Sequence, residues 1–352
     1  MLIMPGKCAR NSPHNSFASA GLAGLVLAGA VAGVWAGWYR PALRPADPTA
    51  TSAVLVHLPS GASARDFCRL LASKGLVRSE TAALVYGYLG DKRCRLRAGY
   101  YDLSPAMSVP EIFTAVAEGR VATRKVAVVP GLRLEQVAER IERAGLVSAS
   151  DFLKAARASV FLSETGLPIP PTATLEGYLW PATYTIPVGT RAHDIALVML
   201  EAFRERFAKP RAAEIAASGM TLHEVVTLAS LVEREAVVDD ERPLIAGVLL
   251  NRLRRGWRLQ CDATVQYALG RHKSRLSYED LKVASPYNTY LHTGLPPGPI
   301  CMPSEASLLA ALRPARHEYF FYVACGGGRH VFTRTYEEHL AAIAAIRGGG
   351  RG

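Results

Sequence analysis

The sequence lacks the common signatures of several enzyme classes. His223-Glu224 is not followed by the second histidine that a zinc-protease helix needs four residues after the first, because Thr227 stands there. No G-x-S-x-G, P-loop or G-x-G-x-x-G motif occurs in the chain. These absences disfavour a metalloprotease, a serine hydrolase and a nucleotide-binding enzyme, and we expect neither a metal nor a cofactor.

Cysteine is scarce, with six residues in 352, and none falls in a C-x-x-C or a zinc-like Cys/His spacing. Cys8 precedes an apolar segment and would lie in another compartment from the rest. If the bulk of the chain is exported, Cys68 and Cys94 could form a disulfide, but buried thiols are an equal alternative.

The chain also lacks a Lys/Arg-rich block with interleaved aromatic residues. Its 41 Lys and Arg exceed its 30 Asp and Glu, for a net charge of +11, but the basic residues are scattered over predicted helices. The charge therefore favours an anionic surface or polymer as partner over a nucleic acid.

No charged residue occurs between residues 17 and 39, a length that can cross a bilayer. Trp35 and Trp38 lie where an interfacial aromatic belt is expected. We predict a membrane-spanning helix at 17–39, an amino-terminal segment at 1–16 and a linker at 40–53. A cleavable signal peptide ending near Ala30 is the alternative, and the flanking charges leave the orientation open.

Residues 54–77 and 126–147 look like two copies of one unit, each reading strand, Pro/Gly turn, helix and a closing Gly-Leu-Val. One such unit is too small to bury its apolar face alone. We predict that the copies pair, with a strand at 99–103 and a helix at 109–117, into one α+β module spanning 54–160.

A run of apolar residues at three- and four-residue spacing predicts a core helix at 221–235. Glu233 and Glu235 at its end point about 200° apart, on opposite edges of the apolar face. A carboxyl group at such an edge is poorly solvated, which raises its pKa as a general acid requires. Two solvated glutamates at a helix end are the alternative, and helical geometry does not choose between the pair.

The remaining pattern predicts a mixed α+β catalytic domain at 161–346 and a disordered tail at 347–352. The expected helices cover 192–207, a segment capped by Asp239 or Asp240 that runs through 253, a short one from 262, and 305–312. We also expect a strand at 257–261, a hairpin of 319–323 with 330–333, and a last helix opening at Thr335.

Two loops rich in Pro, Gly and aromatic residues, one before and one after it in the chain, flank the core helix at 221–235, called the glutamate helix below. Sugars are bound by planar polar side chains and aromatic faces, so we predict a sugar-binding cleft whose members are Glu176, Gln260, Asp262, Asn288 and Tyr290. A hydrolytic glycosidase usually needs two carboxylates, whereas a lytic transglycosylase needs one.

Several motifs then resemble the MltG/YceG family of membrane-anchored endolytic murein transglycosylases: EGYLWPATY, LASLVERE, the NRL at 251–253, RLQCDATVQYALG and PYNTYLHTGLPPGPI. The resemblance extends from about residue 54 and is strongest over 175–332. It implies a cytoplasmic amino terminus, one inner-membrane helix and a periplasmic body with a LysM-like module in the duplicated region. It also implies cleavage of nascent peptidoglycan between N-acetylmuramic acid and N-acetylglucosamine, with 1,6-anhydro ends that terminate strand growth, possible synthase partners and no cofactor.

The resemblance makes Glu235 the catalytic residue and Glu233 a supporting one. Cys261 and Ala263 depart from the residues common in the family, and both adjoin Asp262. Two alternatives stay open at this point. One is a non-catalytic cell-wall-binding scaffold, and the other is a hydrolytic muramidase that pairs Glu235 with Asp262 or Glu176.

Overall fold

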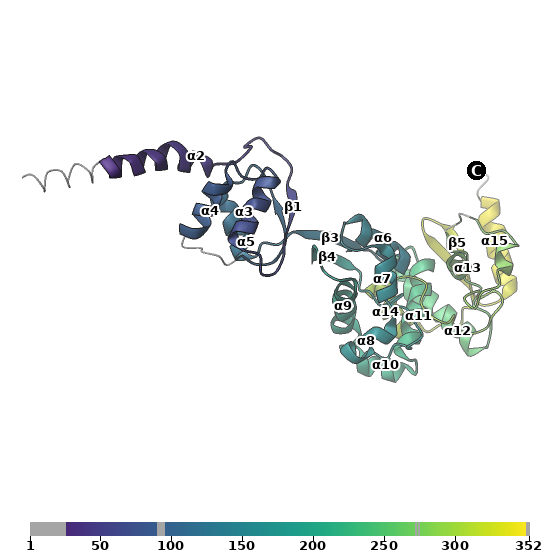
Figure 1. Ribbon diagram of the computed structural model, residues 1–352. Helices are drawn as coiled ribbons and strands as arrows, with labels where there is room; N and C mark the ends of the chain where they lie inside the picture. Colours follow the sequence, from purple (N-terminus) through teal and green to yellow (C-terminus); the bar gives the residue numbers. More distant parts are fainter. Residues whose placement is uncertain (1–25, 90–95, 272, 274, 350–352) are drawn as a thin grey trace, which may run out of the picture. The chain divides into compact units, whose positions relative to one another are not determined.

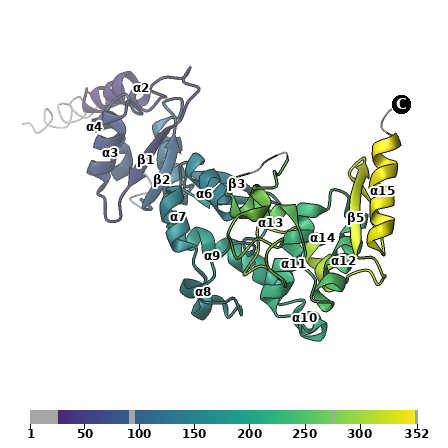
Figure 2. The ribbon, with the colours of Figure 1, turned by 90° about the vertical axis from the view of Figure 1, so that its right-hand side faces the viewer.

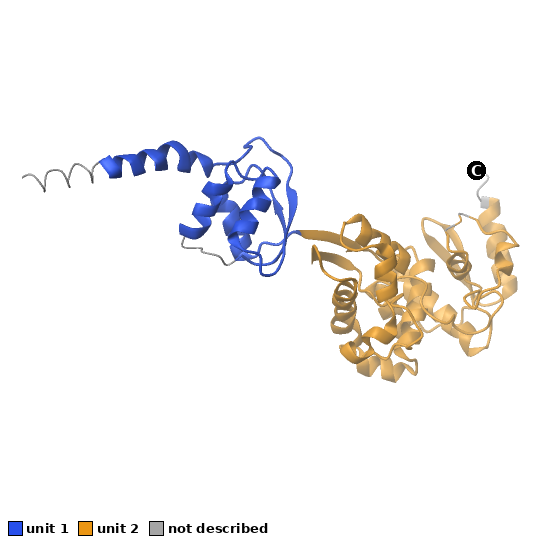
Figure 3. Cartoon of the chain, viewed as in Figure 1, with its two compact units in different colours: residues 1–122 blue, residues 123–352 orange. Residues whose placement is uncertain are grey.

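The computed structural model describes residues 26–89, 96–271, 273 and 275–349. The chain divides between Ala122 and Thr123 into two compact units (Figure 3). The described residues of both units mix helices with two-stranded antiparallel sheets, which confirms the predicted α+β class.

The division separates the two repeated segments. The first copy lies in unit 1 and pairs its strand with 99–103, while the second lies in unit 2 and pairs its strand with 182–187. The predicted single module containing both copies is therefore wrong. Each repeat buries its apolar face with a different partner strand, and such non-local partners leave no trace in the repeat itself.

Unit 1 consists of a two-stranded sheet covered by helices (Figure 1). Its elements are β1 (Val54–Leu58), α3 (Ala64–Ser73), α4 (Glu80–Leu89), β2 (Gly99–Leu103) and α5 (Val109–Glu118). Val56 pairs with Tyr101 in the antiparallel register, and both side chains are buried against Phe67 and Phe113. The hydroxyl of Tyr101 donates to the carbonyl of Arg97 at 2.6 Å, which satisfies its polar end.

The described part of the predicted membrane segment, residues 26–39, is helical and continues through η1 (Trp35–Tyr39) into α2 (Arg40–Ala42). Residues 17–25 of that prediction, residues 1–16, Cys8 and Cys94 lie outside the described residues. Among the described helices, no single one is long and apolar enough to cross a membrane. Only the bent pair α10 (Ala212–Ser218) and α11 (Leu222–Glu235) is long and apolar enough when taken together, across an 86° bend.

The first strand of unit 2 pairs with a strand that comes much later in the chain. The first elements of the unit are β3 (Thr123–Val128), α6 (Leu134–Arg143), α7 (Ala149–Ala155), α8 (Ala158–Thr165), β4 (Ala182–Pro187), α9 (Ala192–Phe203) and the π-helical turn η2 (Arg204–Ala208). Val128 pairs with Ala182, so β3 and β4 run antiparallel. The stretch 151–187 thus includes most of α7, all of α8 and β4.

The centre of unit 2 is the glutamate helix, α11 (Leu222–Glu235), which packs on α14 (Glu305–Leu312), α12 (Arg242–Arg254) and α13 (Asp262–Ala268) (Figure 2). Thr221 and Glu224 form its capping box, and every residue from Val225 to Val232 is buried. Gly177 lies against this helix at φ +82°, where a Cβ would come within 2.9 Å of Val226, so only glycine fits.

The remaining elements are α10 (Ala212–Ser218), the turns η3 (Asp239–Glu241) and η4 (Asp280–Lys282), β5 (Phe321–Gly326), β6 (Arg329–Thr333) and α15 (Tyr336–Gly349). The predicted hairpin and last helix are confirmed, and α15 packs on β5 in both views (Figures 1 and 2). The strand predicted at 257–261 is wrong. Gln260 adopts φ +54°, and this left-handed turn interrupts the extended run.

Candidate active site

Glu235 is the last residue of α11, and its side chain is partly buried. The hydroxyl of Tyr322, on β5, donates a hydrogen bond to its Oε2 at 3.1 Å. Burial raises the pKa of Glu235 above its ordinary value, and the charge of Asp262 raises it further. Tyr322, His330 and the backbone N–H of Ala263 lower the pKa of Glu235 but do not cancel the effect of burial. The site therefore holds a carboxyl group that keeps its proton to a higher pH than a surface glutamate.

A second layer of contacts holds Tyr322 in place. The ring of His330 packs edge-on against it at 5.4 Å, and His330 Nδ1 lies 2.7 Å from the buried carboxylate of Glu241. Burial raises the pKa of the Tyr322 hydroxyl well above its usual value, so this group stays protonated and donates. Sequence analysis missed Tyr322, His330 and Glu241, because Glu241 ends η3 (Asp239–Glu241) while the other two lie on a hairpin far along the chain, and only the fold brings them together.

Glu233 has surroundings quite unlike those of Glu235. Its Oε2 accepts hydrogen bonds from Ser304 N at 2.9 Å, Ser304 Oγ at 2.5 Å and Ser307 Oγ at 2.7 Å. It also pairs with the Arg242 guanidinium at 3.2 Å, with both side chains at least nine-tenths buried. This carboxylate ties α11 to α12 and to the start of α14.

Asp262 and Tyr290 lie together beside Glu235. The hydroxyl of Tyr290 donates to Asp262 Oδ1 at 2.5 Å, and the charge of Asp262 raises the pKa of Glu235. Gln260 precedes them, and its backbone N–H donates to the carbonyl of Thr289 at 3.1 Å. The structure thus brings Asp262 and Tyr290 to the glutamate, with Gln260 on the turn that precedes them; their binding of sugar stays a prediction.

Asn288 organises its own loop. Its amide nitrogen donates to the carbonyls of Leu281 and Val283, both at 2.9 Å, and its oxygen accepts from Tyr290 N at 2.9 Å. The side chain is fully buried. These bonds leave the amide little capacity for a ligand, so its described contacts support the loop that carries Tyr290.

Glu176 is buried at the other end of α13. Both of its oxygens accept from Leu134 N, at 3.1 and 3.0 Å, and the hydroxyl of Tyr267 lies 3.4 Å from Oε2. Burial raises the pKa of Glu176 to about 8, against the opposing effect of the Leu134 N–H. Its described contacts are with the first turn of α6 and with Tyr267.

This shift predicts a pH-dependent stability that Glu176→Gln removes. Between about pH 4.5 and about pH 8 the unfolded chain ionises Glu176 while the folded chain keeps it protonated, so stability falls as pH rises through this window. We expect this residue to contribute a slope of about 1 kcal/mol per pH unit. Urea unfolding across the window checks it, and an unchanged slope in the Gln variant would contradict the assignment.

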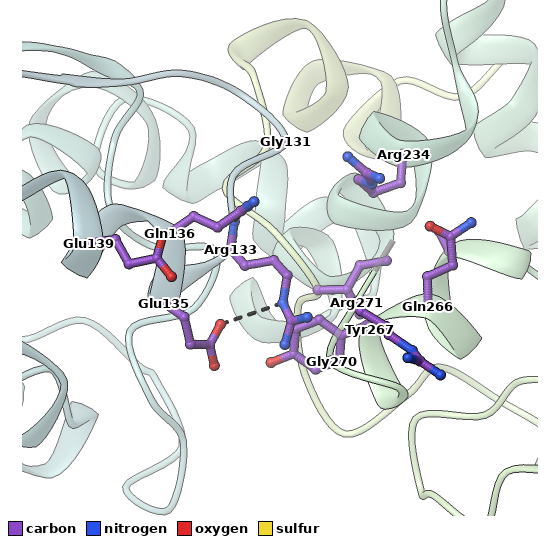
Figure 4. Close-up of a pocket in the computed structure, with 12 residues that line it drawn as sticks. Gly131, Arg133, Glu135, Gln136, Glu139, Arg234, Gln266, Tyr267, Gly270 and Arg271 are labelled. Atoms are coloured by element: carbon purple, nitrogen blue, oxygen red, sulfur yellow. Dashed lines mark hydrogen bonds and ion pairs between the residues drawn. The ribbon is translucent and has the colours of Figure 1, made fainter. Parts of the chain in front are cut away.

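A cleft of about 750 Å³ lies along α13; Glu235 does not line it, but the adjacent Arg234 does. Four segments line it: the first turns of α6 with the turn before them, Arg234 at the end of α11, α13 with the turn that follows it, and Ile300 in the loop before α14 (Figure 4). Ala263 lines this cleft, and its backbone N–H also lowers the pKa of Glu235. The acid and the cleft therefore share the start of α13.

A carboxyl group of raised pKa at a helix end, hydrogen-bonded to a tyrosine and close to a polar cleft, is the arrangement of an acid–base enzyme that acts on a polar substrate. Residues 56–345 match the model of the YceG-like family, and the chain belongs to this family.

Proteins of known name and structure agree with this assignment. The chain is 33% identical to the endolytic murein transglycosylase of Bacillus subtilis over 314 residues, which cover 85% of this chain and 86% of that protein. The endolytic murein transglycosylase of Streptococcus pneumoniae is 28% identical over 333 residues, and the match spans 60% of its length. A crystal structure of a YceG-like protein from Listeria monocytogenes superposes with a TM-score of 0.57 at 36% identity, covering 82% of this chain and 98% of that one.

Proposed function

We propose that the chain is an endolytic lytic transglycosylase of peptidoglycan. It cleaves nascent glycan strands between N-acetylmuramic acid and N-acetylglucosamine, leaves 1,6-anhydro ends and so terminates strand growth. The observation that carries the proposal is the raised pKa of Glu235 beside a polar cleft. The named relatives, with their murein transglycosylase activity, support the same substrate.

The reaction needs one carboxyl group in two protonation states. Glu235 donates its proton to the glycosidic oxygen, and the bond to the leaving sugar breaks. The resulting carboxylate is stabilised by the Tyr322 hydroxyl and the Ala263 N–H, the groups that lower the pKa of Glu235. It then takes the proton from the C6 hydroxyl of the muramic sugar, whose oxygen closes the anhydro ring at C1. No water enters the product.

A hydrolytic muramidase is the second candidate, because Asp262 is near enough to raise the pKa of Glu235. In that reaction a second carboxylate assists water, and the new ends are reducing. Digestion of purified glycan strands by the full-length chain, followed by mass spectrometry of the ends, separates the two. Anhydro ends support the transglycosylase, and ends heavier by one water exclude it. A scaffold without catalytic activity would leave the strands intact.

Tyr322→Phe tests the proposed role of the acid. Loss of the hydroxyl removes a hydrogen bond that lowers the pKa of Glu235, so this pKa rises further. We expect the alkaline limb of the rate profile, where Glu235 loses its proton, to move to higher pH, with a rate roughly tenfold lower at the optimum. Tyr184→Phe, which removes a hydroxyl bonded to the Trp180 carbonyl, is the control and should leave the limb in place. A profile unmoved by Tyr322→Phe would contradict this role.

Location and anchoring belong to the same proposal. The exposed apolar residues Val31, Trp35 and Trp38 on the amino-terminal helix support a single inner-membrane span. The proposed orientation, with the amino terminus in the cytoplasm and the body in the periplasm, rests on the family resemblance. We further propose that the β1–α3–α4–β2 part of unit 1 is the LysM-like module, and that peptidoglycan synthases are partners. Cell fractionation with protease protection of the body tests the location.

A further inference from the structure

The cleft beside Glu235 carries more cationic groups than acid catalysis requires. Arg133, Arg234 and Arg271 line it, and Glu135 and Glu139 lie on the α6 side (Figure 4). Within the described residues, Arg234 and Arg271 form no ion pair or hydrogen bond. Two guanidinium groups are thus available to an anionic ligand.

Arg133 adds a donor that is already oriented. Its guanidinium stacks on the Tyr267 ring at 4.5 Å, and its Nε forms an ion pair with Glu135 Oε2 at 3.5 Å that is not a hydrogen bond (Figure 4). This Nε is buried and has no hydrogen-bond partner among the described residues. A buried donor without a partner is rare, and a ligand acceptor would satisfy it.

The cleft lining contains both arginines and glutamates, and this mixture of charges favours some anionic ligands over others. A diphosphate, as at the lipid-linked end of a strand, would be repelled by Glu135 and Glu139. A peptide with carboxylates and a free amino group complements both signs. In peptidoglycan such a peptide hangs from C3 of the muramic sugar, close to the C1 bond that breaks. The cleft and Glu235 share Ala263, so the peptide of the sugar being cleaved lies within reach of the cleft.

We propose that this cleft is the subsite for the peptide stem, and that Arg133, Arg234 and Arg271 bind the carboxylates of that stem. The proposal rests on the proposed peptidoglycan substrate. It makes the enzyme selective for strands that still carry peptides, and it assigns specificity to residues that do not touch the bond being broken.

Binding measured without turnover tests the subsite independently of the reaction. The full-length Glu235→Gln chain is titrated by calorimetry with three soluble strand preparations: with free peptide carboxylates, with the same carboxylates amidated, and with the peptides removed. We expect strands with free carboxylates to bind roughly tenfold or more tightly than either of the others.

The double substitution Arg234→Gln/Arg271→Gln, added to that chain, should reduce the preference for free carboxylates roughly tenfold. Because neither arginine is paired within the described residues, the substitutions break no described ion pair and the fold should persist. Arg347→Gln is the control, since this exposed arginine on α15 does not line the cleft, and it should keep the full preference.

Equal affinity for free and amidated strands, or a preference that survives the double substitution, would overturn the subsite. If instead the proposed function is wrong, the wild-type chain releases no anhydro ends, whatever the binding measurements give.

Discussion

Glu235→Gln is expected to lower the rate of glycan cleavage at least a thousandfold while the protein stays folded. The amide cannot donate the proton that the leaving oxygen needs, nor accept the proton from the C6 hydroxyl. Its shape is retained and its oxygen can still accept from Tyr322 at the distance found for the acid, 3.1 Å. The measurement is the amount of anhydro ends released from purified strands, by mass spectrometry.

Thermal unfolding of the same variant supplies the control for folding. Because the pKa of Glu235 is raised in the folded chain, ionisation of this carboxyl is disfavoured there; glutamine removes that penalty, so we expect stability equal to or above that of the wild type at neutral pH. A folded Glu235→Gln variant that releases anhydro ends at the wild-type rate would remove Glu235 from the mechanism.

Glu233→Gln is expected to act on stability instead. The change removes the charge that faces the buried Arg242 guanidinium and weakens the bonds from Ser304 and Ser307 to the same oxygen. Breaking a buried ion pair on one side costs several kcal/mol, and the amide oxygen retains part of the hydrogen bonding, so we expect a loss of about 3 kcal/mol. Arg242 keeps a second partner in Asp239 at 2.8 Å.

The folded fraction of the Glu233→Gln variant should retain a good part of the cleavage activity. Urea unfolding and cleavage assays, both at a temperature where the variant is folded, separate the two effects. Glu214→Gln is the matched control, because it removes one partner of the exposed pair with Arg313 and should cost less than about 1 kcal/mol. A Glu233→Gln variant that is stable but inactive, beside an active Glu235→Gln variant, would reverse the assignment of the two glutamates.

Elements with strong local signals were predictable from the sequence. The core helix with its Thr221 cap, the helix α14 behind Ser304 and the last helix after Thr335 all follow from periodicity and capping residues near in sequence. The β5 and β6 hairpin follows from two strand-like segments joined by Gly326–Gly328. In these places the chain folds on neighbours within a few residues.

Elements decided by distant partners were not predictable. The strands of the repeats paired with segments far along the chain that the repeat pattern does not mark. At 257–261 the alternation suggested a strand, but no neighbouring strand among the described residues pairs with this segment. Gln260 instead bonds to Thr289, and the left-handed turn that this requires ended the extended run.

The sequence by itself determined that a core helix ends in two glutamates, that an uncharged amino-terminal run exists, and that the motifs resemble one family. It could not tell Glu233 from Glu235, because a helix places both at edges of the same apolar face. The tertiary structure separates their surroundings. Glu233 meets Arg242 and two serines, whereas Glu235 meets Tyr322, 87 residues later in the chain, in a partly buried position that raises its pKa. The difference is one of desolvation and charge partners, and these are properties of the folded chain alone.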